Sequence, residues 1–125
     1  MPAEHWQDEP EQHDFPAAGD YLSLLFSPQE SADIVAALRA AETTRRKAKD
    51  LLRASRLPLL PADDAHVKSD LAKVADGKRL SPVLLVRGRA ETGIPLTVAD
   101  GYHRICASYR LDEDADVPCR LVGLP

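Results

Sequence analysis

Chemistry is concentrated in one short stretch of the sequence, Ala99-Asp100-Gly101-Tyr102-His103-Arg104. An aspartate, a histidine and an arginine occur there within five positions, next to a glycine. Arginine offers a planar fork of donors to phosphate oxygens, and histidine adds a donor whose charge can be tuned. These residue types in this spacing predict a site for an anion, with phosphate as the best match.

The elements expected on either side place this stretch at a strand-to-helix turn. Residues 94–99 are apolar and predict a strand, and the apolar spacing of residues 103–111 predicts a helix. A glycine at such a turn permits a positive φ and lets a ligand approach the backbone. The first amides of a helix lack internal acceptors and favour an anion. His103 and Arg104 oppose the helix dipole there, which makes sense if an anion lies between them and the helix end.

Asp100 has three interpretations from sequence. It can cap the helix, which requires no ligand. It can also hold a Mg²⁺ ion on bound phosphates, or orient His103. The candidate phosphate- or nucleotide-binding residues are therefore Asp100, Gly101, Tyr102, His103 and Arg104, with Asp100 as a candidate Mg²⁺ ligand.

The rest of the chain predicts an α+β fold, with a small mixed β-sheet and packed helices. Residues 82–86 and 94–99 read as a hairpin, residues 117–122 as a strand, and residues 57–60 as an edge strand or an extended connector. A helix is expected from Asp63 or Asp64 to Gly77.

A long N-terminal helix is expected to precede this unit, from about Pro28 to Ser55. Ser27-Pro28-Gln29-Glu30 has the residues of a capping box with proline in the first turn. Its apolar stripe either covers the sheet of the same chain or pairs with a partner, which includes a second copy of the chain. The stripe consists of Ile34, Leu38, Ala41, Ala48 and Leu52.

Charge is distributed unevenly over the 125 residues. The net charge is −4, but residues 1–38 carry −8, residues 39–56 carry +5 and the remainder carries −1. The acidic total argues against nucleic acid as a partner, although the basic segment 39–56 leaves a weak case for it. Residues 1–19 are acidic and contain prolines, so we expect a flexible arm with Trp6 and Phe15 as anchors.

The location expected from the sequence is the cytoplasm. No apolar run is long enough for a membrane span, and the acidic N-terminus is unlike a signal peptide. Cys106 and Cys119 lie beside apolar residues and predict buried free thiols. Neither the cysteine spacing nor the scattered histidines predict a zinc site.

Residues 57–122 resemble the ParB/sulfiredoxin-like superfamily, specifically a ParB N-terminal-like domain with a DGxHR motif. The resemblance rests on Asp-Gly-Tyr-His-Arg at 100–104, on Ile105 and Ala107, and on Val117-Pro118-Cys119-Arg120-Leu121-Val122. It implies a nucleotide, ATP, ADP or CTP with Mg²⁺, bound through its phosphates at the turn. It divides the chain into an arm (1–19), a helical region (20–56) and a ParB/sulfiredoxin-like domain (57–125).

Two departures from the family limit what the resemblance implies. Sulfiredoxins have a catalytic cysteine directly before the His-Arg pair, where this chain has Tyr102, so sulfinic acid reduction is not expected. The sequence ends at Pro125 without the helix-turn-helix of partition proteins, so operator binding is not expected either. The motif is also similar to that of ParB-like serine kinases, which need a carboxylate base. The candidates for that base are Asp70, Glu91 and the Asp112-Glu113-Asp114 loop.

Three functional hypotheses follow from the sequence. The first is a module that binds a small phosphate-bearing ligand or nucleotide at Gly101–Arg104. The second is a phosphoryl-transfer or nucleotide-hydrolysing enzyme of the ParB-like kinase type that uses the same turn. The third is a non-catalytic interaction protein that forms a homodimer through helix 28–55, with His103 and Arg104 as ordinary surface residues.

Overall fold

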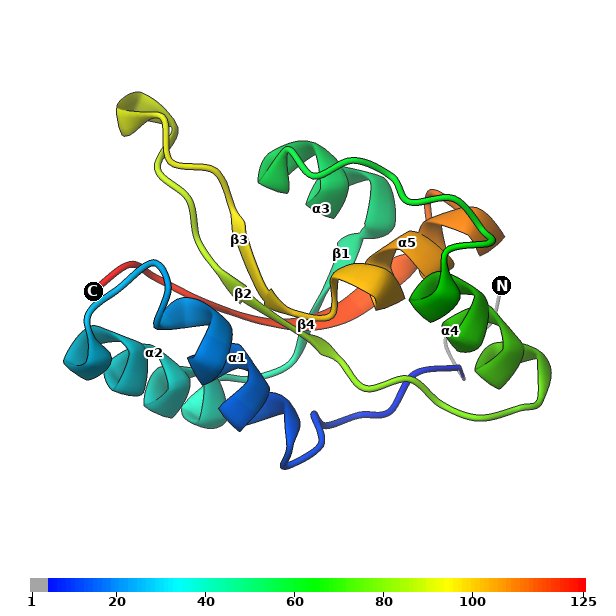
Figure 1. Ribbon diagram of the computed structural model, residues 1–125, viewed down its shortest axis with the longest axis horizontal. Helices are drawn as coiled ribbons and strands as arrows, with labels where there is room; N and C mark the ends of the chain where they lie inside the picture. Colours follow the sequence, from blue (N-terminus) through cyan, green and yellow to red (C-terminus); the bar gives the residue numbers. More distant parts are fainter. Residues whose placement is uncertain (1–4) are drawn as a thin grey trace.

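The computed structural model describes residues 5–125 and confirms a mixed α+β chain (Figure 1). In that range five α-helices and a 3₁₀ turn accompany a four-stranded sheet. The helices are α1 (Asp14–Leu22), α2 (Pro28–Ala40), α3 (Ala48–Ser55), α4 (Ala65–Ala75) and α5 (Tyr102–Leu111). The strands are β1 (Thr44–Lys47), β2 (Val83–Val86), β3 (Thr97–Asp100) and β4 (Asp116–Val122), and the 3₁₀ turn is η2 (Ala90–Thr92).

The sheet is mixed, with the strand order β1-β4-β2-β3. β2 and β3 form the antiparallel hairpin that the sequence predicts, with η2 at its tip. β4 runs parallel to β2 and antiparallel to β1. All four residues of β2 are buried, as expected of an apolar run in a central strand. Residues 57–60 form an extended connector rather than an edge strand.

Helices cover both faces of the sheet, so the chain has two apolar cores (Figure 1). Alternating residues of β2 point to opposite faces, with Leu84 and Val86 in one core and Val83 and Leu85 in the other. α1 and α2 cover the first face. α3 and α5 cover the second, and α4 packs against α5.

The prediction of one long helix from Pro28 to Ser55 is wrong, because strand β1 separates α2 from α3. The helix does begin as predicted, with a capping box between Ser27 and Glu30. It ends at Ala40, shortly before Thr43 and Thr44, whose β-branched side chains favour extended backbone. β1 gains a ladder of backbone hydrogen bonds to β4 that a continuous helix would forgo.

The apolar side chains of the expected stripe are buried in the two cores of the same chain. Ile34 and Leu38 pack in the core under α1 and α2, and Ala48 and Leu52 pack in the core under α3 and α5. These four side chains are buried on opposite faces of the sheet. They therefore do not form one continuous surface through which the chain could dimerise.

The N-terminal segment is packed against the domain over the residues that the structure describes. Residues 1–4, the start of the expected arm, lie outside the described residues. From residue 5 onward, this segment contacts the rest of the chain through both of its predicted anchors. Trp6 and Phe15 are both buried, Trp6 forms a β-bridge with Leu80, and α1 begins at Asp14.

Strand β1 places the middle of the basic segment 39–56 at the edge of the sheet, where two lysines form ion pairs with the start of β4 and with the loop before it. All four residues of β1 are exposed, and charged side chains on an edge strand discourage pairing with other chains. Lys49 lies 2.6 Å from Asp114, and Lys47 lies 3.7 Å from Asp116. In residues 5–125 no helix is long and apolar enough to cross a membrane.

The two thiols provide a test of this packing. Cys106 and Cys119 are free and buried, as predicted, and burial raises the pKa of both. Above an ordinary thiol pKa of about 8.5, the unfolded chain loses protons that the folded chain retains. We therefore expect the free energy of unfolding to fall as the pH rises above about 8.5. Urea denaturation between pH 7.5 and 9.5 measures this slope.

The control for that measurement is the double variant Cys106→Ala/Cys119→Ala. It loses packing at every pH, so its absolute stability is lower, but its stability depends less on pH over this range. An identical slope in the two proteins would contradict the prediction.

Candidate functional site

A register shift in the β2–β3 hairpin determines on which face of the sheet Asp100 lies. Leu84 pairs with Asp100 and Leu85 pairs with Val98, so β3 holds one extra residue, Ala99, at this point. Side chains of directly opposed residues lie on the same face of a sheet. Asp100 therefore shares the face of Leu84, on which α1 packs. In a regular ladder Asp100 would pair with Val83 and face the other core.

Gly101 turns the chain from β3 into α5, with the positive φ (108°) that the sequence predicts. The space above its α-carbon is filled from within the protein. An added Cβ would lie 2.4 Å from Val83 Cγ1 and 2.8 Å from Arg104 Nη2. Glycine is required here because the core and the arginine pass this close, whereas the sequence suggested that a ligand does so.

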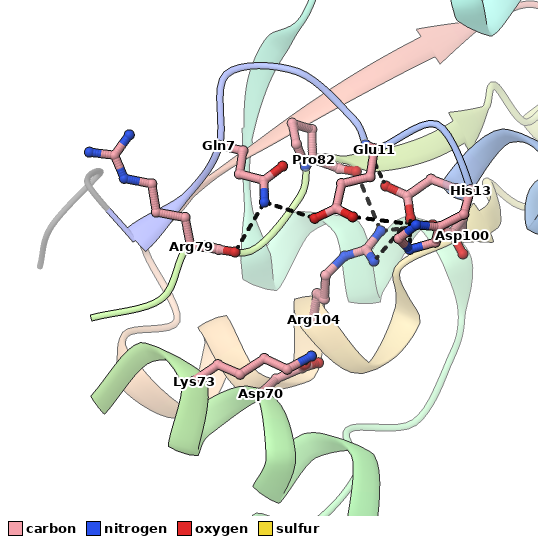
Figure 2. Close-up of polar contacts among 10 residues, drawn as sticks. Gln7, Glu11, His13, Asp70, Lys73, Arg79, Pro82, Asp100 and Arg104 are labelled. Atoms are coloured by element: carbon pink, nitrogen blue, oxygen red, sulfur yellow. Dashed lines mark hydrogen bonds and ion pairs between the residues drawn. The ribbon is translucent and has the colours of Figure 1, made fainter. Parts of the chain in front are cut away.

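The guanidinium group of Arg104 contacts groups of the same chain (Figure 2). Its Nη2 donates to Asp100 Oδ2 at 2.9 Å and to the carbonyl of Pro82 at 3.3 Å, and its Nη1 lies 3.9 Å from Asp14 Oδ1. Figure 2 shows the side chain pointing toward Pro82 and Asp100 and away from the α4 residues Asp70 and Lys73. The arginine of the predicted cradle therefore already has carboxylate partners.

Asp14 is the residue of this network that sequence reasoning missed. Its side chain is 3% exposed, and its Oδ2 accepts from the backbone amide of Glu11 at 3.0 Å. His13 Nε2 lies 3.4 Å from its other oxygen. An isolated aspartate in an acidic segment gives no local signal of this role, because its partner is ninety positions further along the chain.

The interpretation of Asp100 as the cap of the helix is wrong. The N-cap of α5 is Gly101, and no side chain of residues 5–125 caps this helix. Asp100 instead pairs with Arg104. Burial raises the pKa of Asp100, and the attraction of Arg104 opposes that rise.

The residues around Asp100 do not fit a Mg²⁺ ion. Mg²⁺ binds carboxylate oxygens at about 2 Å, and here the guanidinium of Arg104 occupies the carboxylate. Within residues 5–125 no group of three or more histidine, cysteine or acidic side chains is arranged to hold a metal ion. We therefore assign no metal ligand.

Tyr102 points away from the turn toward the connector before α4. Its hydroxyl donates to the carbonyl of Pro58 at 2.5 Å, and burial raises its pKa. Tyr102 therefore ties α5 to residues 57–60 and does not line the polar cavity next to the turn.

That polar cavity, of about 190 Å³, lies between α4 and the start of α5. His103 is the donor of the motif that lies at its wall, with its side chain 41% exposed. Its ring lies 4.7 Å from that of His66, and its Nε2 lies 4.0 Å from Asp64 Oδ2. The lining residues are His66, Ser69, Asp70 and Lys73 from α4, and Asp100, Gly101, His103 and Arg104 from the turn.

Of the α4 residues that line this cavity, sequence reasoning named only Asp70, although a signal for the others exists. His66, Ser69, Asp70 and Lys73 have the spacing i, i+3, i+4, i+7, which places four polar side chains on one face of a helix. Of the carboxylates proposed as a base, Asp70 lines the cavity, whereas Glu91 and the loop 112–114 do not. Burial raises the pKa of Asp70, and Lys73, Arg104, His103 and His66 oppose that rise.

No protein-family model, curated protein or solved structure matches this chain. The site is therefore argued from its own geometry.

We expect Gly101→Ala to destabilise the protein by at least about 2 kcal/mol, because a left-handed alanine and an overpacked contact each cost roughly 1–2 kcal/mol. Gly93→Ala is the matched control, since Gly93 also has a positive φ (75°) but open space around it. Urea denaturation should show the smaller loss for Gly93→Ala. Equal losses would mean that the contacts above Gly101 contribute nothing.

We expect Asp14→Ala and Arg104→Ala to be coupled by about 1–3 kcal/mol in a double-mutant cycle, because the two side chains share one buried network. The exposed pair Asp50 and Arg53, 3.5 Å apart, is the control and should show no measurable coupling. Chemical denaturation of the two sets of variants gives both values. Additive effects at Asp14 and Arg104 would contradict the network.

Proposed function

We propose that the cavity between α4 and α5 binds the phosphate group of a small ligand. The observation that carries this proposal is the convergence of His66, Lys73 and His103 from two helices on one polar cavity at the start of α5. These side chains can supply donors and positive charge. Phosphate binding at a helix N-terminus needs both.

The α5 terminus adds a second source of donors. Because Gly101 is the N-cap, no side chain of the described residues accepts from the first amides of this helix. These amides carry the positive end of the helix dipole. Gly101 and His103 both line the cavity, so this end of α5 borders it.

The resemblance to the ParB/sulfiredoxin-like superfamily also supports a phosphate ligand, and we propose that the small mixed sheet and its helices are a fold of that type. The cradle differs from the one that the motif implies. In this proposal His103 keeps its role as a donor, and Gly101 provides the turn but no approach for a ligand. Arg104 holds the turn together through Asp100, and His66 and Lys73 supply the further donors. A nucleotide remains one candidate source of the phosphate.

A phosphoryl-transfer enzyme is the second candidate function, and the position of Asp70 favours it. This carboxylate shares the cavity with the phosphate-binding groups, as a general base must. Release of inorganic phosphate from ATP or CTP, absent in Asp70→Asn and present in Asp76→Asn, would support the enzyme. Binding without turnover would support the binding module.

We expect isothermal titration calorimetry to detect inorganic phosphate binding that weakens at least tenfold in Lys73→Ala/His103→Ala. A tenfold loss corresponds to about 1.4 kcal/mol, the contribution of one charge-assisted hydrogen bond. Lys68→Ala/His103→Ala is the matched control for the lysine, because Lys68 lies on α4 but does not line the cavity.

Two results would overturn this proposal. One is the absence of binding by the wild-type protein at millimolar phosphate, ATP, ADP and CTP. The other is an equal loss in the Lys73 and Lys68 double variants, which would mean that the lysine acts only through the overall charge.

A further inference from the structure

Asp70 is a carboxylate on the wall of a cavity whose other free groups favour an anion. The residue is 8% exposed, and its closest charged partner is Lys73, one turn along the same helix, at 3.8 Å. From α5, His103 and Arg104 act on it through charge, and His66 does so from α4. Within residues 5–125, its carboxylate accepts no hydrogen bond at hydrogen-bonding distance.

The oxygens of Asp70 are not among the fully buried side-chain atoms without a partner, so they reach solvent through the cavity. A ligand that fills the cavity removes that solvent, and a carboxylate then left without a hydrogen-bond donor bears the cost of its burial. This carboxylate would also repel a phosphate bound in the same cavity. Both costs are removed if the ligand that brings the phosphate also brings a donor that reaches Asp70.

We propose that the ligand is a small phosphomonoester with a hydroxyl group close to its phosphate, and that this hydroxyl donates to Asp70. The inference rests on the proposed function, since the phosphate is bound by His66, Lys73, His103 and the α5 terminus. Asp70 then selects among phosphate compounds, because an analogue without the hydroxyl leaves the carboxylate without a hydrogen-bond donor.

The surroundings of Asp70 favour a hydroxyl over an ammonium group as the donor. Lys73 is already paired with this carboxylate, and His66, His103 and Arg104 act on it from two helices. A further cation would enter a site that already holds several positive groups. A hydroxyl donates without adding charge.

The size of the cavity favours a small ligand over a nucleotide. Pockets that enclose drug-sized ligands have volumes of roughly 300–1,000 Å³, whereas this one has about 190 Å³. A phosphate with a short hydroxylated chain is correspondingly smaller. The base and ribose of a nucleotide would extend onto the surface.

The test is calorimetry on the wild-type protein with four probes: inorganic phosphate, glycerol 3-phosphate, propyl phosphate and phosphoethanolamine. Propyl phosphate has the same chain length as glycerol 3-phosphate but lacks its hydroxyls. We expect glycerol 3-phosphate to bind at least tenfold more tightly than propyl phosphate, as the loss of a hydrogen bond to a charged group implies. Phosphoethanolamine should bind no more tightly than propyl phosphate.

The variant Asp70→Asn separates recognition by the carboxylate from a structural role. We expect it to bind glycerol 3-phosphate more weakly than the wild type does, and propyl phosphate and inorganic phosphate equally or more tightly, because a repulsive charge is removed. Damage to the fold would weaken all three. Asp76→Asn, at the end of the same helix and outside the cavity, should behave as the wild type.

The outcomes distinguish this inference from the proposed function. If no probe binds to the wild type, the proposed function fails and this inference fails with it. If inorganic phosphate binds but the wild type does not prefer glycerol 3-phosphate to propyl phosphate, this inference alone fails. ADP binding more tightly than glycerol 3-phosphate, or Asp70→Asn weakening all probes equally, would likewise overturn this inference alone.

Discussion

The architecture depends on a set of ionic contacts that tie the acidic N-terminal segment to arginines far along the chain. Arg104, in the first turn of α5, forms an ion pair with Asp14, and Arg120 of β4 forms one with Glu9. Arg120 also donates to the carbonyls of Leu38 and Arg39, and so satisfies the end of α2. Because both arginines are largely buried, each would be costly without its carboxylates. These contacts hold α1 and α2 on the sheet.

The same contacts change the meaning of the charge pattern around the Asp-Gly-Tyr-His-Arg motif. A cation in the first turn of a helix suggests an external anion, but for Arg104 the anions are Asp100 and Asp14. The basic side chains that line the cavity besides Arg104 are His66, Lys73 and His103. Part of the motif therefore maintains the turn, and the rest of the cavity is contributed by a second helix.

The features that follow from neighbouring residues could be predicted, whereas those that depend on distant partners could not. The hairpin, α4, α5, the capping box at Ser27 and the positive φ of Gly101 are all encoded by residues a few positions apart. β1 forms because β4 lies beside it, and the extra residue in β3 has no signature in its own sequence. Lone polar residues such as Asp14 acquire their role only when the chain has folded.

The way α1 and α2 cover the sheet has a consequence for the order of folding. The two helices leave the ribosome before β2 and β3, because the strand residues that complete their apolar core, Leu84, Val86 and Ala99, are made more than forty positions later. Until then Phe15, Leu22, Ile34 and Leu38 have no sheet to pack against. The nascent N-terminal third therefore presents an incomplete apolar surface to the cell, and its protection from aggregation depends on how soon the second half follows.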